Sequence, residues 1–292
     1  MSHTEKVQKE GEYWENVIAD LSAEGLDFRT REDFVAKDPK YYWEDARIAK
    51  KILAYPKKVL KDKIRHGIKV LDLGSGSGGN AYMLAKLGGD VLGIDVQEKT
   101  IKALNEAMKS EPQVKLTFQH GDLNTVELPE NHFDVILSWN TFHHIEQAER
   151  LIKQIKKSLK KDGVFVLMEH QHTHSMLRKV LAAFFWMVLP TREKFAEKWK
   201  IISNRAKGKS EVELSPAEDS APHDYIDMLK KNFVLKEKRA YFGFTTPFIA
   251  RLRAPAKIRS ALVSGLNALD QALIKLRIVD GEQLFMVFGN KK

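Results

Sequence analysis

Four glycines and one acidic residue stand close together in the segment DLGSGSGGN, residues 72–80. Gly74, Gly76 and Gly79 satisfy the G-x-G-x-x-G spacing of dinucleotide-binding loops, in which the backbone approaches a pyrophosphate at the start of a helix. Asp72 lies two residues before the first glycine, where its negative charge would disfavour a pyrophosphate. The loop predicts a nucleotide-like cofactor but does not by itself decide which one.

Histidines and one glutamate are the residues best suited to moving a proton. One histidine pair occurs in NTFHHIE, and the segment EHQHTHS holds three more after a glutamate. A positioned imidazole or carboxylate can act as a general base toward a hydroxyl nucleophile. The catalytic candidates are His143, His144, Glu169 and His170. His170, His172 and His174 alternate and could converge on a metal ion, but no matching carboxylate motif accompanies them, so we expect no metal site.

Alternating strands and helices are expected to position these groups. Continuous apolar runs are typical of buried parallel strands, and apolar residues three to four positions apart are typical of helices. Strands are predicted at 68–74, 90–96, 114–122, 133–139, 164–170, 233–244 and 282–291, and helices at 79–89, 98–110 and 145–163. The last helix is predicted to stop at Gly163. This alternation predicts βαβ units, with a parallel sheet covered by helices on both faces.

The pattern D-x-G-x-G-x-G at residues 72–78 resembles motif I of the class I S-adenosylmethionine-dependent methyltransferases. Three further segments resemble that family in order: Asp95 ends the second strand, GDL at 121–123 follows the third, and FDVILSWNTFHHI contains the fourth. The resemblance covers residues 68–170. It implies an α/β fold: a Rossmann-like, doubly wound, mostly parallel seven-stranded sheet with a helical N-terminal extension and helical C-terminal insertions.

The resemblance also implies S-adenosylmethionine as the cofactor, whose positive charges favour a nearby carboxylate. Asp95 would then take both ribose hydroxyls, and Asp122 would accept a hydrogen bond from the adenine amine. Asp95 could alternatively act as the N-cap of the helix that follows. The implied cofactor-binding residues are Asp72, Gly74, Gly76, Gly78, Asp95, Val96, Gly121, Asp122, Leu123, Ser138, Trp139 and Asn140.

The chain has 292 residues, of which 43% are hydrophobic and 30% charged, so it can bury a full core. We expect a helical N-terminal cap over residues 1–60 and a methyltransferase domain over residues 61–292. Within that domain, helical insertions at about 174–222 and about 246–278 are expected to form a lid.

Two C-terminal patterns have structural interpretations. Ser215 and Glu218 have the spacing of a capping box, with Pro216 at the first helical position, which predicts that a helix begins there. A leucine stripe runs from Leu262 to Leu276 at helical spacing. Such a stripe suits either a core or a partner helix, so the sequence leaves the oligomeric state open.

The formal net charge is +9, and the basic excess lies outside the glycine-loop block. Residues 68–170 hold 12 basic and 14 acidic side chains, whereas 178–209 hold 9 and 2, and 230–277 hold 11 and 2. Either an anionic partner or a solvated basic surface would account for this asymmetry. The apolar run at 180–190 is too short to span a bilayer. Its basic flanks would permit membrane contact, but a buried lid helix is favoured.

The sequence contains no cysteine, and its N-terminus lacks the apolar core of a secretory signal. We therefore expect a cytoplasmic protein, with peripheral membrane contact as an alternative. The predicted activity is O-methylation of a small-molecule, glycan or lipid-linked acceptor, and such a partner is favoured over nucleic acid. The alternatives are an RNA methyltransferase that uses the basic C-terminal third and an NAD(P)-dependent oxidoreductase. Asp72 and the segment 121–123 oppose the oxidoreductase.

Overall fold

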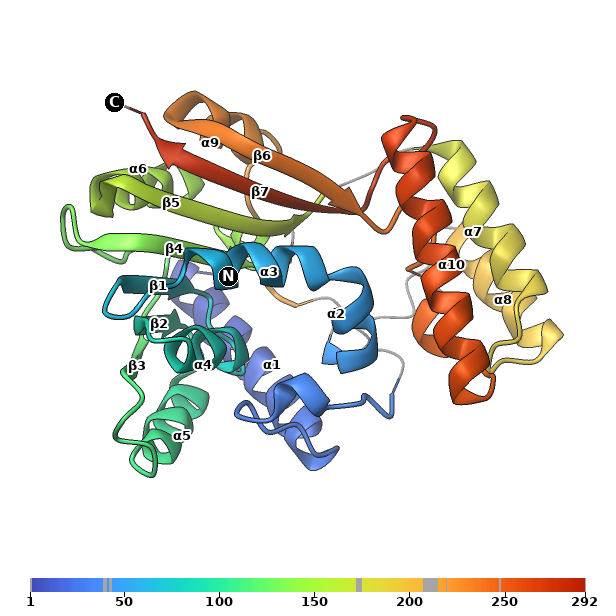
Figure 1. Ribbon diagram of the computed structural model, residues 1–292, viewed down its shortest axis with the longest axis horizontal. Helices are drawn as coiled ribbons and strands as arrows, with labels where there is room; N and C mark the ends of the chain where they lie inside the picture. The colour runs from blue at the N-terminus through green and yellow to red at the C-terminus, as the bar shows by residue number, and fades with distance from the viewer. Residues whose placement is uncertain are drawn as a thin grey trace.

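A seven-stranded sheet runs through the centre of the computed structural model, which describes residues 2–38, 41, 44–171, 175–206, 215–218, 220–246 and 248–291 (Figure 1). The strands are β1 (Lys69–Leu73), β2 (Asp90–Asp95), β3 (Leu116–His120), β4 (Phe133–Trp139), β5 (Leu159–His170), β6 (Phe233–Tyr241) and β7 (Gln283–Asn290). Their order is β3-β2-β1-β4-β5-β7-β6, and all pairs are parallel except the two that β7 makes. The expected mostly parallel seven-stranded sheet is confirmed.

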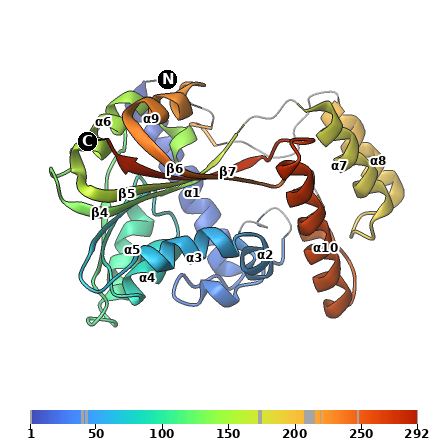
Figure 2. The same ribbon diagram turned by 45° about the horizontal axis from the view of Figure 1, so that its top comes forward.

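Helices cover both faces of this sheet. Four of them alternate with the strands: α4 (Gly79–Lys86), α5 (Glu98–Met108), α6 (Ala148–Ser158) and α9 (Tyr225–Asn232). Successive strand side chains point to opposite faces, so Val70 and Leu71, both fully buried, belong to two different hydrophobic clusters. The first cluster includes residues of α4 and α5, and the second includes residues of α6 and α9. Figure 2 shows these pairs of helices on opposite faces, which confirms the doubly wound arrangement.

The N-terminal segment is helical, as expected, but it does not end where we predicted. It forms α1 (His3–Ala23), a short 3-10 helix (Arg31–Asp33), α2 (Ala46–Ile52) and α3 (Ala54–Lys63). The boundary expected after residue 60 falls inside α3, because the fully buried Leu60 packs in the same cluster as Val70. Near the middle of α1, Gly11 lies so close to β2 that a Cβ there would be 3.0 Å from the carbonyl oxygen of Val96. The first helix therefore lies against the loop that follows β2.

Three C-terminal helices form a lobe at one end of the molecule: α7 (Met176–Val188), α8 (Phe195–Ala206) and α10 (Ala256–Lys275) (Figures 1 and 2). The expectation that α7 is a buried lid helix is wrong, because Val180 and Phe184 are 57% and 58% exposed while Trp186 is buried. The leucine stripe of α10 is also divided, with Leu266 buried and Leu269 exposed. No helix in the described parts of the chain is long and apolar enough to cross a membrane.

Two predicted element ends are corrected by the structure. Helix α6 ends at Ser158 and not at Gly163, because Leu159 already pairs with Phe133 of β4. No helix begins at Ser215: residues 215–218 form a turn, and the helix of this region begins at Tyr225.

Candidate active site

The glycine loop joins β1 to α4 and requires glycine for two reasons. Gly74, Gly76 and Gly78 all have positive φ angles, of 72°, 49° and 79°, a region that side chains disfavour. At Gly74 an added Cβ would also lie 2.1 Å from the hydroxyl oxygen of Thr141. The loop is thus a close-fitting backbone cradle at the carboxyl end of β1, where ligands bind in open α/β sheets.

Asp72 lies beneath this loop, fully buried. Within the described structure, no donor makes a hydrogen bond of normal geometry to either of its carboxylate oxygens. Burial, followed by repulsion from Asp95, raises the pKa of Asp72 to about 7. A buried carboxylate in this condition is stabilised by a cationic partner.

Asp95, at the end of β2, ties the glycine loop to the next turn. Its carboxylate accepts hydrogen bonds from the backbone N–H of Gly76 at 2.8 Å and of Gln97 at 3.1 Å. Burial raises its pKa despite these bonds. The N-cap of α5 is Gln97, so the alternative role of Asp95 as that cap is wrong. Each carboxylate oxygen accepts more than one hydrogen bond, so the group can still receive ligand hydroxyls.

Asp122, after β3, is in contact with the first turn of α1. Its Oδ1 accepts a hydrogen bond from the backbone N–H of Asn124 at 2.8 Å, and its Oδ2 lies 2.9 Å from Nε2 of His3. The hydrogen bond to Asp122 raises the pKa of His3. The first turn of α1 thus reaches the end of the cavity that lies beside β3.

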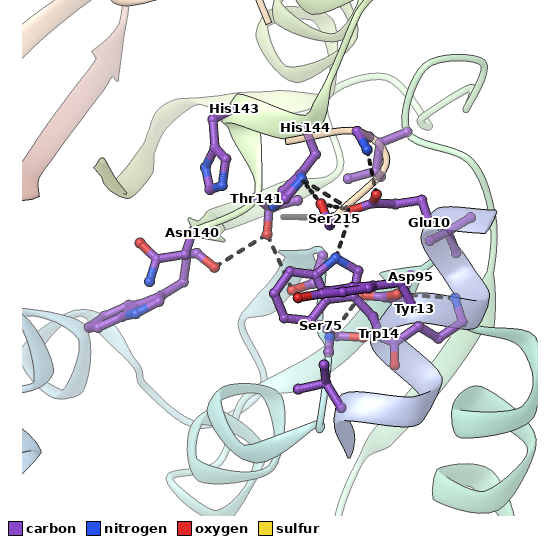
Figure 3. Close-up of a pocket in the computed structure, with 18 of the residues that line it drawn as sticks. Glu10, Tyr13, Trp14, Ser75, Asp95, Asn140, Thr141, His143, His144 and Ser215 are labelled. Atoms are coloured by element: carbon purple, nitrogen blue, oxygen red, sulfur yellow. Dashed lines mark hydrogen bonds and ion pairs between the residues drawn. The ribbon is translucent and has the colours of Figure 1, made fainter. Parts of the chain in front are cut away.

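These elements enclose a cavity of about 380 Å³ (Figure 3). Of the residues proposed from the sequence, those that line it are Gly74, Gly76, Asp95, Val96, Gly121, Asp122, Leu123, Trp139, Asn140, His143, His144 and His170. Asp72, Gly78, Ser138 and Glu169 lie behind the lining, and Ser138 and Glu169 are at most 1% exposed. Helix α1 supplies Glu10, Tyr13 and Trp14 to the wall, which the sequence did not predict. From the expected lid segments, only Ser215, Ala217 and Glu218 among the described residues line the cavity.

His143 is held by a carboxylate that does not itself face the cavity. Its Nδ1 lies 2.5 Å from Oε1 of Glu169, a fully buried side chain that also accepts from the backbone N–H of Phe142 at 2.7 Å. Burial alone would raise the pKa of Glu169, but the charge and hydrogen bond of His143 outweigh it and keep the pKa low. Glu169 therefore positions His143, and our expectation that it could act directly on a substrate is corrected.

His144 belongs to a second group that connects α1 with the turn at 215–218. Its Nδ1 lies 3.1 Å from Oε1 of Glu10, and Glu10 also accepts from the hydroxyl of Ser215 at 3.0 Å. The backbone N–H of Ala217 donates to the other oxygen of Glu10 at 2.7 Å. His144 is thus engaged by Glu10, whereas His143 keeps Nε2 toward Glu218, 3.6 Å away.

His143, His144 and Glu218 each offer one ligand atom within 4.8 Å of the others, an arrangement that could hold a metal ion. His170 is half-buried, and its removal from water lowers its pKa and favours the neutral imidazole. Its Nε2 lies 3.2 Å from the amide nitrogen of Gln283. His172 and His174, the other members of the alternating histidines, lie outside the described residues.

A family model described as a methyltransferase domain matches residues 71–167, which run from β1 into β5 and carry the glycine loop, Asp95, Asp122 and His143. This segment is a class I, S-adenosylmethionine-dependent methyltransferase domain.

Relatives of the methyltransferase domain act on different acceptors. Phosphoethanolamine N-methyltransferase of Plasmodium falciparum is 34% identical over 118 residues, which cover 39% of this chain and 44% of the relative. A sterol 24-C-methyltransferase of Gibberella zeae is 33% identical over 108 residues, covering 36% of this chain and 28% of the relative. The chain thus matches less than half the length of these relatives. A chain of the solved complex of the Haloferax volcanii Trm112 methyltransferase activator has the same fold, with a TM-score of 0.50 and 15% identity over 89% of this chain and 100% of that one.

The residues of the methyltransferase domain fit S-adenosylmethionine. The buried Asp72, whose carboxylate oxygens receive no hydrogen bond of normal geometry from the described residues, suits a positively charged ligand, and a cradle that any Cβ at Gly74 would fill suits close backbone approach. These two observations match the cationic, phosphate-free cofactor better than a pyrophosphate. Sequence patterns could locate this half of the site because its residues lie at or just beyond the carboxyl ends of predicted strands.

The acceptor half of the methyltransferase site was mostly missed. Glu10, Tyr13 and Trp14 belong to EYWENVIADL and the residues just before it, whose aromatic side chains were the one available signal. Ser215 and Glu218 carried the spacing of a helix cap, and the contact of Ser215 with Glu10 spans 205 residues of sequence. No local pattern indicates such a contact.

Proposed function

We propose that this protein transfers a methyl group to a hydroxyl of a small acceptor, with His143 as the general base. The observation that carries the proposal is the pair of His143 and the buried Glu169, whose atoms lie 2.5 Å apart. With Nδ1–H donating to Glu169, Nε2 of His143, which lies 3.6 Å from Glu218, is the ring nitrogen that can accept a proton at the cavity wall. A hydroxyl needs such an acceptor because its proton must leave as the new bond forms.

The cofactor half of the proposal assigns one group to each part of the ligand. S-adenosylmethionine supplies an electrophilic methyl group on a sulfonium. Asp95 takes the ribose hydroxyls, Asp122 accepts from the adenine amine, and the loop from Gly74 to Gly78 encloses the amino-acid end. Asp72 contributes negative charge beneath that loop. The burial of Asp72 and Asp95 strengthens their interactions with the ligand relative to water.

The acceptor half favours a compact substrate: a small molecule, a glycan or the head of a lipid-linked intermediate. Helix α1 and the turn at 215–218 cover the cavity beside His143, and Glu10 joins them through Ser215 and Ala217. Closure of this kind excludes water and orients the acceptor. The carboxylates of Glu10 and Glu218 at this end disfavour an RNA acceptor, which would bring phosphates.

An amine acceptor is the second candidate, and one carboxylate and one aromatic ring favour it. Glu218 lies 3.6 Å from Nε2 of His143, and the ring of Trp14 lines the same wall. A carboxylate and an aromatic face together attract an ammonium group. His143 would then remove its proton before transfer. Phosphoethanolamine N-methyltransferases among the relatives act on an amine, as their name states.

The test measures transfer of labelled methyl from S-adenosylmethionine to panels of small hydroxyl-bearing and amine-bearing acceptors, with mass spectrometry to locate the methyl group. His143→Ala should lower kcat by about 10²- to 10⁴-fold and leave the affinity for S-adenosylhomocysteine unchanged. His66→Ala, at an exposed position outside the cavity, is the control. A kcat unaffected by His143→Ala would overturn the base assignment. A chain that binds NADH and not S-adenosylhomocysteine would overturn the whole function.

A further inference from the structure

The lobe of α7, α8 and α10 exposes far more apolar surface than the rest of the described chain. Eleven of the fifteen exposed large hydrophobic side chains lie in these helices or within three residues after α10. They are Met176, Leu177, Val180, Phe184, Val188, Phe195, Trp199, Ile258, Leu269, Leu276 and Ile278. Scattered exposed apolar residues are normal on a protein, but such a concentration marks an interaction surface.

On α7 these side chains form one row along the helix. Met176, Val180, Phe184 and Val188 are spaced by four residues and are each 57% to 69% exposed. Residues four apart lie on the same face of a helix. The next helix adds Phe195 and Trp199, again four apart, at 71% and 63% exposed.

The opposite side of α7 is anchored to the body of the protein, so the exposed row is not the result of a loosely placed helix. Phe185 packs against Phe244 with ring centroids 5.0 Å apart. At the start of α7, Arg178 forms an ion pair with Glu282 at 2.7 Å. The helix thus has a buried side and an apolar side that faces solvent.

The charge of the lobe is strongly positive. Residues 178–209 hold 9 basic and 2 acidic side chains. Lys179, Lys194 and Lys200 are exposed on the two helices or the turn between them. Of the two acidic residues, Glu193 is paired with Arg251 at 2.8 Å. The lobe therefore combines an apolar row with a net positive surround.

We propose that this lobe docks on the surface of a membrane that carries anionic lipids, with the exposed row of α7 and the aromatic side chains of α8 entering the headgroup region. Interfacial binding requires apolar side chains on one face, basic residues near them and preferably aromatic residues at the boundary. All three occur here within one helical hairpin. The like charges of two such lobes would repel each other, which favours a lipid surface over a second copy of the chain.

The proposal does not depend on the acceptor or on the methyl transfer. It concerns where the protein is held, and α7 begins six residues after His170 of the cavity wall. A membrane-bound lobe would therefore place the catalytic domain beside lipids or lipid-linked molecules. The proposal and the proposed function can each fail without the other.

The experiment is flotation of the full chain with vesicles of phosphatidylcholine alone or of phosphatidylcholine mixed with phosphatidylglycerol, at low and high salt. We expect binding to the anionic vesicles only, weakened by salt because surface charges are screened. The variant Phe184→Ser with Trp199→Ser should bind anionic vesicles with an affinity lower by about 10-fold or more, because it removes two aromatic side chains that would enter the headgroup region. Its matched control is Val35→Ser with Leu87→Ser, at two exposed apolar positions outside the lobe.

A second variant tests the charge. Neutralising Lys179, Lys194 and Lys200 with glutamine should lower the affinity for anionic vesicles by about 100-fold, at roughly 1 kcal/mol for each lysine. The matched control neutralises Lys58, Lys102 and Lys153, three exposed lysines elsewhere. S-adenosylhomocysteine binding and circular dichroism verify that every variant is folded.

Several outcomes would overturn the proposal. Absence of co-flotation by the wild-type chain at low salt is one, and equal loss of binding in the control variants is another. Sedimentation that reveals a dimer broken by Phe184→Ser with Trp199→Ser, without vesicle binding, would assign the row to a second copy of the chain.

Discussion

The substitution Asp72→Asn tests the electrostatics of the glycine loop most directly. Burial raises the pKa of Asp72 from an ordinary 3.8 to about 7, so its ionisation opposes folding of the ligand-free protein. A raised pKa contributes stability that is complete below pH 3.8 and is lost as the pH rises through about 7. At about 1.4 kcal/mol per pKa unit, the cost of the ionised group approaches about 4 kcal/mol above pH 7. Asparagine has the same shape and stays neutral.

We therefore expect the ligand-free variant to match the wild type in its free energy of unfolding at about pH 3.5, and to exceed it at pH 8 by up to about 4 kcal/mol. Urea denaturation at the two pH values measures this difference. The control is Asp162→Asn, at an exposed position, which should change neither value by more than about 0.5 kcal/mol.

The same variant should bind S-adenosylhomocysteine less tightly, by about tenfold at pH 8, because the ammonium of that ligand loses an opposite charge. Calorimetry measures the affinity. A variant that is less stable than the wild type at pH 8, or whose affinity does not change, would show that Asp72 is satisfied by the protein itself and does not serve a cationic ligand.

Three further substitutions probe the rest of the site. Gly74→Ala should destabilise the fold by about 3 kcal/mol or more, because it combines a positive φ with a Cβ 2.1 Å from Thr141. Gly76→Ala also has a positive φ but meets open space, so it should cost only about 1 to 2 kcal/mol. Thermal unfolding compares the two variants, and equal costs would refute the steric argument. Asp95→Ala should weaken S-adenosylhomocysteine binding by about 10-fold or more in calorimetry, and an unchanged affinity would exclude the ribose role. The low pKa of Glu169 stabilises the fold above pH 4.5, and this stabilisation is lost as the pH falls toward 2. Glu169→Gln should therefore weaken the decrease in the free energy of unfolding between pH 4.5 and pH 2, and it should lower kcat by about 10²-fold or more. An unchanged pH dependence of unfolding in that range would show that the ion pair adds no stability.

The sheet and the cofactor half of the site could be predicted because local patterns determine them. Buried strands produce apolar runs, and acidic residues of the site lie at the ends of those runs, as Asp95 ends β2. The element ends were less certain where tertiary pairing overrides local preference. Gly163 has the pattern of a helix stop, yet α6 ends five residues earlier, at Ser158, because Leu159 pairs with Phe133 of the neighbouring strand.

The acceptor half could not be predicted, since it depends on contacts between distant segments. Glu10 joins Ser215 across 205 positions, and no periodicity relates the two. Glu169 was selected for its residue type and its place after a strand, but only the packing shows that it lies behind His143. The exposed face of α7 was likewise invisible, because an apolar run looks the same whether one side of the helix or both sides are covered.

Helix α1 has a consequence for turnover. It touches one end of the cavity through the contact of His3 with Asp122, and the other end through the contact of Glu10 with the turn at Ala217. Neither ligand can then exchange freely while the helix is seated, so we expect its departure to limit the rate of product release. Conversely, a filled cavity should hold the helix in place, and the time the N-terminal segment survives a protease should lengthen with ligand concentration. The protease sensitivity of the first helix would thus indicate whether the cavity is filled, with no need to measure methyl transfer.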